Sequence, residues 1–245
     1  MADSTNHTLR QISSGGVVTT FAGSAGSTGT TDATGTAARF NLPNGVAVDG
    51  SGALYVTDTT NNSIRKITAS GVVSTLAGTP GVSGYADGTG AGALFNHPTG
   101  VALDGSGNIY VADTGNSTIR KISSGGVVTT LAGLPTIGGK RDGANSDAWF
   151  NQPKSLVVDS SGNVYVADTG NAAIRKITAS GVVSTLSFTA GTTTTPGTGT
   201  GGTGSTGTTT TTPTSSGGGG GGAIEGWLVG ALVALFLFRH RSPPR

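Results

Sequence analysis

Short apolar runs alternate with turn-forming residues over the first 187 positions, and the whole arrangement recurs every 55 residues. Three full copies begin at Phe40, Phe95 and Phe150. In the second copy the apolar runs are residues 100–103, 108–112, 117–122 and 127–131. These runs are rich in Val, Ile, Tyr and Thr, which favour strands, and the Gly, Asn and Asp between them favour tight turns. The pattern predicts four short antiparallel strands in each copy.

The two inner runs of each copy are apolar on both faces, as residues 101–103 and 109–112 show. Strands of this kind belong to a sheet that is covered on both sides. A four-stranded meander that repeats at a fixed period and packs face to face on its copies is a β-propeller blade. The predicted fold is therefore all-β, an incomplete β-propeller. Its blades are expected at residues 40–78, 95–133 and 150–187.

Residues 1–23 read as the back half of a first blade, because Asn6, Arg10 and Ile12 precede Asn61, Arg65 and Ile67 by 55 positions. Met1 then falls in the middle of a strand. We expect 14 strands, two from this half copy and four from each full copy, in an open arc of blades. The missing front half is expected either upstream in a longer chain or from another source.

Each copy runs from Phe-Asn-x-Pro through Tyr-Val-(Ala/Thr)-Asp to Asn-x-x-Ile-Arg-Lys-Ile, and this motif resembles the NHL repeat. The resemblance covers residues 2–187. It implies a propeller, which most members of the family close with six blades. It also implies two classes of function, since related propellers include binding modules, a peptide-amidating lyase with a His-bound metal, and lactonase-type hydrolases with calcium.

The composition argues against several chemistries. The chain has no Cys, so a thiol nucleophile and a thiolate zinc site are excluded. Residues 1–222 hold 11 Lys and Arg against 11 Asp, which leaves no basic excess for nucleic-acid binding. Three His residues, in the opening half copy, one blade and the tail, cannot form a three-His zinc site within one chain. No cofactor is predicted.

Positions that recur in every copy are predicted to support the blade. The repeated aspartates are predicted to act as turn acceptors or as partners of the repeated arginines, which are predicted to serve stability. The aspartates are Asp58, Asp113 and Asp168, and the arginines are Arg65, Arg120 and Arg175. An alternative for these aspartates is a ring of carboxylates near the propeller axis that holds a cation, for which calcium is the suitable metal.

Positions where the copies differ are the better candidates for specific binding. The connectors are the segments that precede the repeated Phe, such as residues 79–94 between the first two full copies. The third connector, residues 134–149, is unusual because Lys140, Arg141 and Trp149 differ in type from the residues of the other connectors, and Tyr85 in the second connector is likewise unmatched in type. Trp and Arg are enriched at binding hot spots, although Trp149 is equally suited to packing between blades. His97 is a further candidate, and its alternative interpretation is a loop surface residue.

The remaining chain divides into three segments. Residues 188–222 are almost entirely Thr, Gly, Ser and Pro, which predicts a disordered linker. Residues 223–238 are apolar apart from Glu225 and predict a transmembrane helix of about 24 Å, short of a bilayer core of about 30 Å. The basic tail, residues 239–245, is expected in the cytoplasm, so the propeller is expected outside.

This tail also resembles the GlyGly-CTERM class of bacterial sorting signals. The residues that carry the resemblance are Gly221, Gly222, Trp227, Arg239 and Arg241. It implies cleavage by an intramembrane sorting protease, rhombosortase, near the glycines, and a permanent membrane anchor is the alternative.

The predicted function is therefore a membrane-tethered or surface-released propeller that binds or scaffolds a protein or glycan. The alternative is a fragment of a propeller enzyme, a lyase or a hydrolase, whose catalytic blades lie elsewhere.

Overall fold

The computed structural model describes residues 1–188, of which Met1–Leu186 form one unit. Every sheet in this part of the chain is antiparallel, and its helices are single 3-10 turns of three residues. Within residues 1–188 no helix is long and apolar enough to cross a membrane. The predicted transmembrane helix at 223–238, the tail at 239–245 and all but the first residue of the linker lie outside the described residues.

The blades are numbered in chain order, so the half copy at the start is blade 1 and the three full copies are blades 2, 3 and 4. Blade 2 shows the repeating unit in its simplest form. Its sheet has the order β4-β5-β6-β7. The strands are β4 (Pro43–Val48), β5 (Leu54–Asp58), β6 (Ser63–Ile67) and β7 (Val73–Ala77). The turn between β4 and β5 is held by Asp49, whose Oδ1 accepts the N–H groups of Ser51 and Ala53. Gly52 supplies the left-handed backbone that this turn needs, with φ of 82°.

Blades 3 and 4 contain a fifth strand that the sequence pattern did not predict. Blade 3 has the order β8-β12-β11-β10-β9, and blade 4 has the order β13-β17-β16-β15-β14. The extra strands β8 (Gly88–Thr89) and β13 (Gly143–Ala144) come from the connectors and pair with the outermost strands. The remaining strands are β9 (Pro98–Leu103), β10 (Ile109–Asp113), β11 (Thr118–Ile122), β12 (Val127–Ala132), β14 (Pro153–Val158), β15 (Val164–Asp168), β16 (Ala173–Ile177) and β17 (Val182–Thr185). Each connector therefore belongs to the blade that follows it.

Blade 1 contains β1 (Ala2–Asp3), β2 (Thr8–Ile12) and β3 (Val18–Ala22). These correspond to the end of the second strand and to the third and fourth strands of a complete blade. The described residues thus hold 17 strands where 14 were expected, because β1, β8 and β13 were not predicted. Each has only two residues, which is too short to show a periodic apolar pattern.

The 3-10 turns occupy two kinds of position. Between the second and third strands of a blade lie η1 (Ser4–Asn6), η4 (Thr114–Asn116) and η6 (Thr169–Asn171). In the connectors lie η2 (Gly35–Ala37), η3 (Gly90–Gly92) and η5 (Asn145–Asp147). The first group ends in a residue with left-handed backbone, such as Ser117 with φ of 56°.

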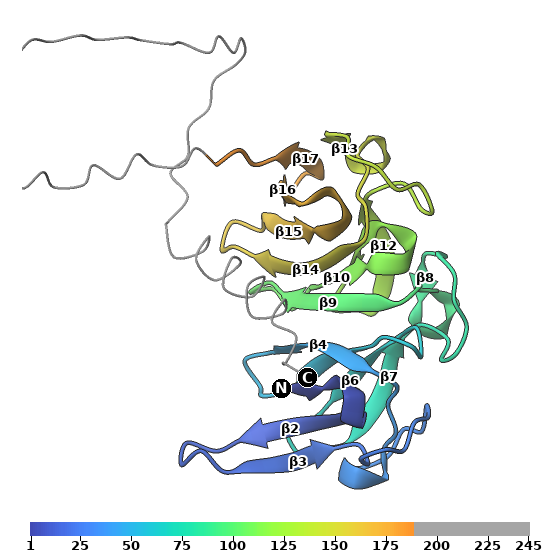
Figure 1. The fold of residues 1–245 in the computed structure, drawn as a ribbon, viewed down its shortest axis with the longest axis vertical. Helices are drawn as coiled ribbons and strands as arrows, with labels where there is room; N and C mark the ends of the chain where they lie inside the picture. The colour runs from blue at the N-terminus through green and yellow to red at the C-terminus, as the bar shows by residue number, and fades with distance from the viewer. Residues whose placement is uncertain (189–245) are drawn as a thin grey trace, which may run out of the picture. The chain divides into compact units, whose positions relative to one another are not determined.

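The sheets follow one another as successive blades, with the innermost strands β4, β9 and β14 side by side (Figure 1). The core between blades is apolar, and Phe40, Phe95 and Phe150 are fully buried in it. Glycine allows the inner strands to approach closely. A Cβ atom on Gly100 would lie 2.7 Å from the carbonyl oxygen of Lys154 in the next blade. The predicted fold class, blades of an incomplete β-propeller, is confirmed.

Gly100→Ala is expected to destabilise the protein by about 1 to 3 kcal/mol, because the new methyl group must push the β9 and β14 backbones apart. Chemical denaturation of the variant measures the loss. Gly105→Ala is the matched control, since nothing lies within 4 Å of its Cβ position, and its stability should change by less than about 0.5 kcal/mol. Equal effects of the two substitutions would contradict close contact between the inner strands.

Candidate functional site

A buried arginine stands at the centre of each complete blade. In blade 3, Nη1 of Arg120 donates hydrogen bonds to Oδ2 of Asp113 and to the carbonyl of Leu94, both at 2.9 Å. Its Nη2 donates to Oδ1 of Asp87 at 2.7 Å and to the carbonyl of Ala86 at 2.9 Å. Its guanidinium lies 5.1 Å from the centroid of the Phe95 ring. We call this group of an arginine, two aspartates, two carbonyls and a phenyl ring the arginine cluster.

The same cluster recurs in the other complete blades. Arg65 contacts Asp58, Asp32 and the Phe40 ring in blade 2. Arg175 contacts Asp168, Asp142 and the Phe150 ring in blade 4. All three arginines are fully buried, at 0% exposure. The repeated Arg and Asp positions singled out in the sequence therefore meet in pairs, one pair in each blade.

The inner aspartate of each cluster is saturated with donors from its own blade. Asp113 accepts the N–H of Asn96 and the side-chain amide of Asn116, both at 2.8 Å, in addition to Arg120. Asp58 and Asp168 have equivalent partners. The structure does not bring these three carboxylates together, and within residues 1–188 no three His, Cys, Asp or Glu side chains form a group that could hold a metal ion.

The second aspartate of each cluster ties the connector to the outermost strand. Asp87 accepts hydrogen bonds from the N–H and the hydroxyl of Thr130 on β12 as well as from Arg120. Asp32 binds Thr75 and Asp142 binds Thr185 in the same way. Sequence reasoning missed this role, although the recurrence of these aspartates at 55-residue spacing was a visible signal.

Burial is the largest influence on the pKa of two inner aspartates, Asp58 and Asp113. It raises the pKa of Asp113 to about 6, although hydrogen bonds from Asn96 and Asn116 and the charge of Arg120 act in the opposite direction. Burial also raises the pKa of Asp58. For the more exposed Asp142, burial acts in the same direction but is outweighed, so that hydrogen bonds from Thr185 and Arg175 lower its pKa. Desolvation is thus the main cost of placing a carboxylate inside the blade.

Hydrogen bonds also join neighbouring blades, and they fix the position of His97. The hydroxyl of Thr59 donates to the carbonyl of Pro98, and Oδ1 of Asn62 accepts the N–H of His97 at 2.9 Å. His97 is exposed, has left-handed backbone with φ of 48°, and places its Nδ1 2.7 Å from Oδ1 of Asn96. It therefore lies in the loop directly before β9.

The connector residues that differ between copies are displayed on a backbone that the arginine clusters hold. The carbonyls of Arg141 and Trp149 accept the Nη2 and Nη1 groups of Arg175, at 2.7 and 2.9 Å. The two residues are bridged across the connector, and the Arg141 guanidinium lies 5.4 Å from the centroid of the Trp149 ring. Lys140 and Arg141 are exposed and Trp149 is partly exposed. Three predicted binding residues therefore belong to one surface.

Tyr85 occupies in the second connector the place that Lys140 has in the third, and its side chain is 57% exposed. The equivalent residue of the first connector is Thr30, which is also exposed. The position directly before the repeated Phe also differs between the connectors, which have Arg39, Leu94 and Trp149 there. Side chains of very different chemistry thus project from a connector backbone that the arginine clusters hold in the same way in each complete blade.

Comparison with known proteins identifies the repeat. The NHL repeat family matches residues 40–67, 95–122 and 150–177. The protein SUPPRESSOR OF QUENCHING 1, chloroplastic, of Arabidopsis thaliana is 36% identical over 132 residues, which cover 50% of this chain and 12% of the relative. NHL repeat-containing protein 2 of Bos taurus is 32% identical over 168 residues, which cover 63% of this chain and 23% of the relative.

The fold is similar to that of solved propeller-like proteins. A structural genomics protein of unknown function from Bacteroides thetaiotaomicron superposes with a TM-score of 0.59 and 28% sequence identity, covering 70% of this chain and 42% of that one. The chain thus spans less than half the length of these relatives. The three matched segments coincide with the first three strands of blades 2, 3 and 4. The chain therefore carries three NHL repeats, which build the complete blades of its incomplete β-propeller.

Proposed function

We propose that the propeller acts as a binding module whose ligand contacts the connector surface, defined as Tyr85, Lys140, Arg141 and Trp149. The observation that carries this proposal is the contrast between fixed backbone and variable side chains. The arginine clusters hold the connector backbone by the same hydrogen bonds in every complete blade. A surface that is ordered before binding loses less conformational entropy when a ligand arrives.

The chemistry of the third connector suits recognition of a protein or a glycan. Trp149 presents part of an aromatic face, and Arg141 lies against its ring. Trp and Arg are among the residue types that contribute most at binding hot spots. Lys140 and Arg141 are exposed beside the exposed Asp142 and Asp147, so the third connector offers charges of both signs to a polar ligand. His97 lies outside this surface and is given no role in it.

Exchanging the variable residues between connectors tests this surface. In the full chain, Lys140→Thr, Arg141→Thr and Trp149→Arg together install the residues of the first connector, Thr30, Thr31 and Arg39. We expect the exchange to weaken binding at least about tenfold, the effect of losing ~1.4 kcal/mol of binding free energy. Ligands come from glycan and peptide arrays, affinities from biolayer interferometry, and folding is checked by thermal melting.

Lys154→Thr is the matched control, because it removes one exposed cation outside the connector surface and also installs a sister residue, Thr99. It should bind like the unmodified chain. If every array ligand binds the exchanged variant as tightly as the unmodified chain, the third connector is not the ligand site, and Tyr85→Thr then tests the second connector in the same way. If no array ligand binds the unmodified chain, the binding function itself is contradicted.

We further propose that the segment after the propeller tethers it to a membrane or directs its release at the cell surface. The support is in the sequence, namely the Thr- and Gly-rich linker 188–222, the apolar segment 223–238 and the basic tail at 239–245. A linker of this composition would hold the propeller away from the membrane.

Expression behind a secretory signal, in a host with the sorting protease, distinguishes release from anchoring. Release predicts that the intact mass of the surface product ends near Gly221 and Gly222 and lacks Trp227. A mass that retains Arg239, Arg241 and Arg245 in a membrane-bound product supports a permanent anchor. A full-length product that stays free of membranes after export contradicts both alternatives.

A further inference from the structure

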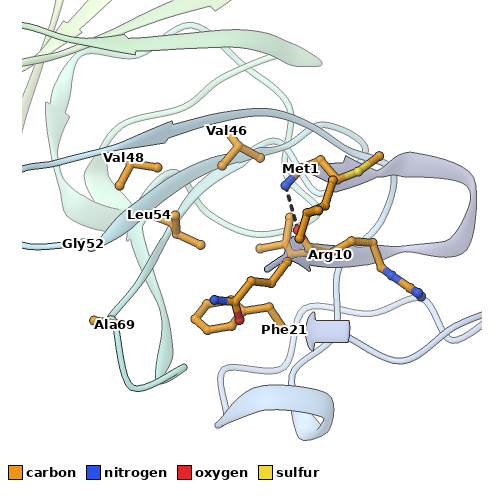
Figure 2. A pocket seen from close by; sticks show the side chains of 11 residues that line it. Met1, Arg10, Phe21, Val46, Val48, Gly52, Leu54 and Ala69 are labelled. Atoms are coloured by element: carbon orange, nitrogen blue, oxygen red, sulfur yellow. Dashed lines mark hydrogen bonds between the residues drawn. The ribbon is translucent and has the colours of Figure 1, made fainter. Parts of the chain in front are cut away.

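The connector surface does not line the pocket that lies between blades 1 and 2. That pocket has a volume of about 490 Å³, and Figure 2 shows Phe21 facing Val46, Val48 and Leu54 across it. No residue of the connector surface is part of its walls. A ligand of the connector surface is therefore held by the exposed side of the connectors.

The third connector forms a strand-like segment that is hydrogen-bonded along one edge. The N–H of Gly139 donates to the carbonyl of Phe150 at 3.0 Å. Two residues further on, Arg141 exchanges backbone hydrogen bonds with Trp149. After two more residues, Gly143 begins β13, which pairs with β17. Every second residue of this segment therefore faces the blade.

The two residues between these positions have backbone groups that face away from the blade. In the described part of the chain, the backbone N–H and C=O groups of Lys140 and Asp142 form no hydrogen bond, and both residues are exposed. In an extended chain the backbone groups of alternate residues point to opposite edges. β13, which continues this segment, is the outermost strand of its sheet (Figure 1). We call the outward backbone groups of Lys140 and Asp142 the free edge.

The free edge is held in position from its inner side. Arg175 donates to the carbonyl of Arg141 at 2.7 Å, and the side-chain amide of Asn171 donates to the carbonyl of Gly139 at 2.8 Å. The carboxylate of Asp142 is bound to β17 by two further hydrogen bonds. A chain that binds at the free edge therefore pairs with a backbone that is already ordered, which lowers the entropy cost of binding.

The spacing of the free edge fits a second extended chain. Lys140 and Asp142 each offer one donor and one acceptor, and residues two apart in a strand are separated by about 7 Å. Alternate residues of an added strand present their own donors and acceptors at the same interval. Exposed edges of this kind bind extended peptides by β-strand addition.

The charges along the free edge favour an acidic partner over a second copy of the chain. The Lys140 side chain has no ion pair with any residue from 1 to 188, whereas Asp142 is already paired with Arg175. An acidic residue of an added strand can therefore face Lys140. An antiparallel pair of two such edges, centred on Lys140, Arg141 or Asp142, places like charges directly opposite each other, which is destabilising.

These observations point to one class of partner. We propose that the free edge binds an extended peptide segment of another protein by β-strand addition, with an acidic residue of the segment facing Lys140. The inference rests on the proposed function, since it uses the connector surface, and it assigns the ligand to peptides rather than glycans. Lys140 and Arg141 are consecutive and point to opposite faces of the connector, so they contact alternate side chains of the segment.

Selection of random heptapeptides displayed on phage, with the full chain as the target, supplies the probes. We expect the selected peptides to carry an acidic residue and to bind 1:1 as synthetic peptides by isothermal titration calorimetry. Peptide binding should slow hydrogen exchange at the amides of Lys140 and Asp142. Exchange at the amide of Gly139, which is already hydrogen-bonded, is the internal control and should not change. Methylation of single backbone nitrogens of the peptide should weaken binding at every second position.

Variants of the full chain separate the backbone contact from the charge. Lys140→Met removes the charge and keeps the N–H, and it should bind the selected peptides about twofold to fivefold more weakly than the unmodified chain. Lys140→Pro also removes the outward N–H, and it should bind at least about fivefold more weakly than Lys140→Met. Tyr85→Pro makes the same backbone change in the second connector and should bind like the unmodified chain. Neither Pro variant breaks a backbone hydrogen bond of the described residues, and thermal melting checks that all three fold.

Equal binding by Lys140→Pro and Lys140→Met would overturn the proposal, as would methylation effects that do not alternate along the peptide. If the selection yields no peptide while a glycan binds the unmodified chain and not the exchanged variant, the proposed function stands and the peptide assignment fails. If neither peptides nor glycans bind the unmodified chain, both fail. A dimer of the unmodified chain that Lys140→Pro abolishes would assign the free edge to a second copy and would also overturn the proposal.

Discussion

The buried guanidinium of each arginine cluster is the constraint on which the rest of the blade depends. A charge removed from water is tolerated only when other charges and hydrogen bonds compensate for its lost hydration. Arg120 obtains that compensation from the second strand of its blade, through Asp113, and from the connector before it, through Asp87, Ala86 and Leu94. One side chain on β11 thus holds two other segments, the second strand and the connector, whose farthest contact lies 34 residues away in sequence. Six aspartates take part in the three clusters. This accounts for much of the acidic content of a chain that has few charged residues.

The arginine cluster also determines which connector positions are free to vary in side chain. The cluster uses backbone carbonyls at two connector positions, and the side chains at those positions remain free to vary. Thr31, Ala86 and Arg141 are equivalent in sequence and hold their blades through the same carbonyl, yet they present different chemistry to solvent. Blade 1 is the converse case. Arg10 has the equivalent position, but within residues 1–188 no arginine cluster forms around it.

The repeat allowed much of the fold to be predicted from sequence. The turns and the strands of blades 2, 3 and 4 follow from a 55-residue period with Gly and Asn at fixed places. β8 and β13 could not be predicted, because two residues such as Gly88 and Thr89 carry no apolar pattern, and their pairing with β12 depends on long-range contacts such as that of Asp87 with Thr130. Recurrence indicated that Asp113 acts either as a turn acceptor or as a partner of Arg120, and the structure shows the contact with Arg120. The second carboxylate was not predicted, since the distance between Asp87 and Arg120 in sequence conceals their contact. The predicted linker, membrane segment and sorting residues lie outside the described residues.

A double-mutant cycle on Arg120 and Asp113 tests the central claim most directly. Each single change to Ala should lower the free energy of unfolding by about 3 to 5 kcal/mol, because it leaves the other charge buried without its partner. The double variant should lose much less than the sum, since both charges are then absent. Lys140→Ala, at an exposed position, serves as the control and should leave stability nearly unchanged. An unchanged melting curve for Arg120→Ala, or strictly additive losses in the double variant, would contradict the claim that the arginine cluster holds the blade together.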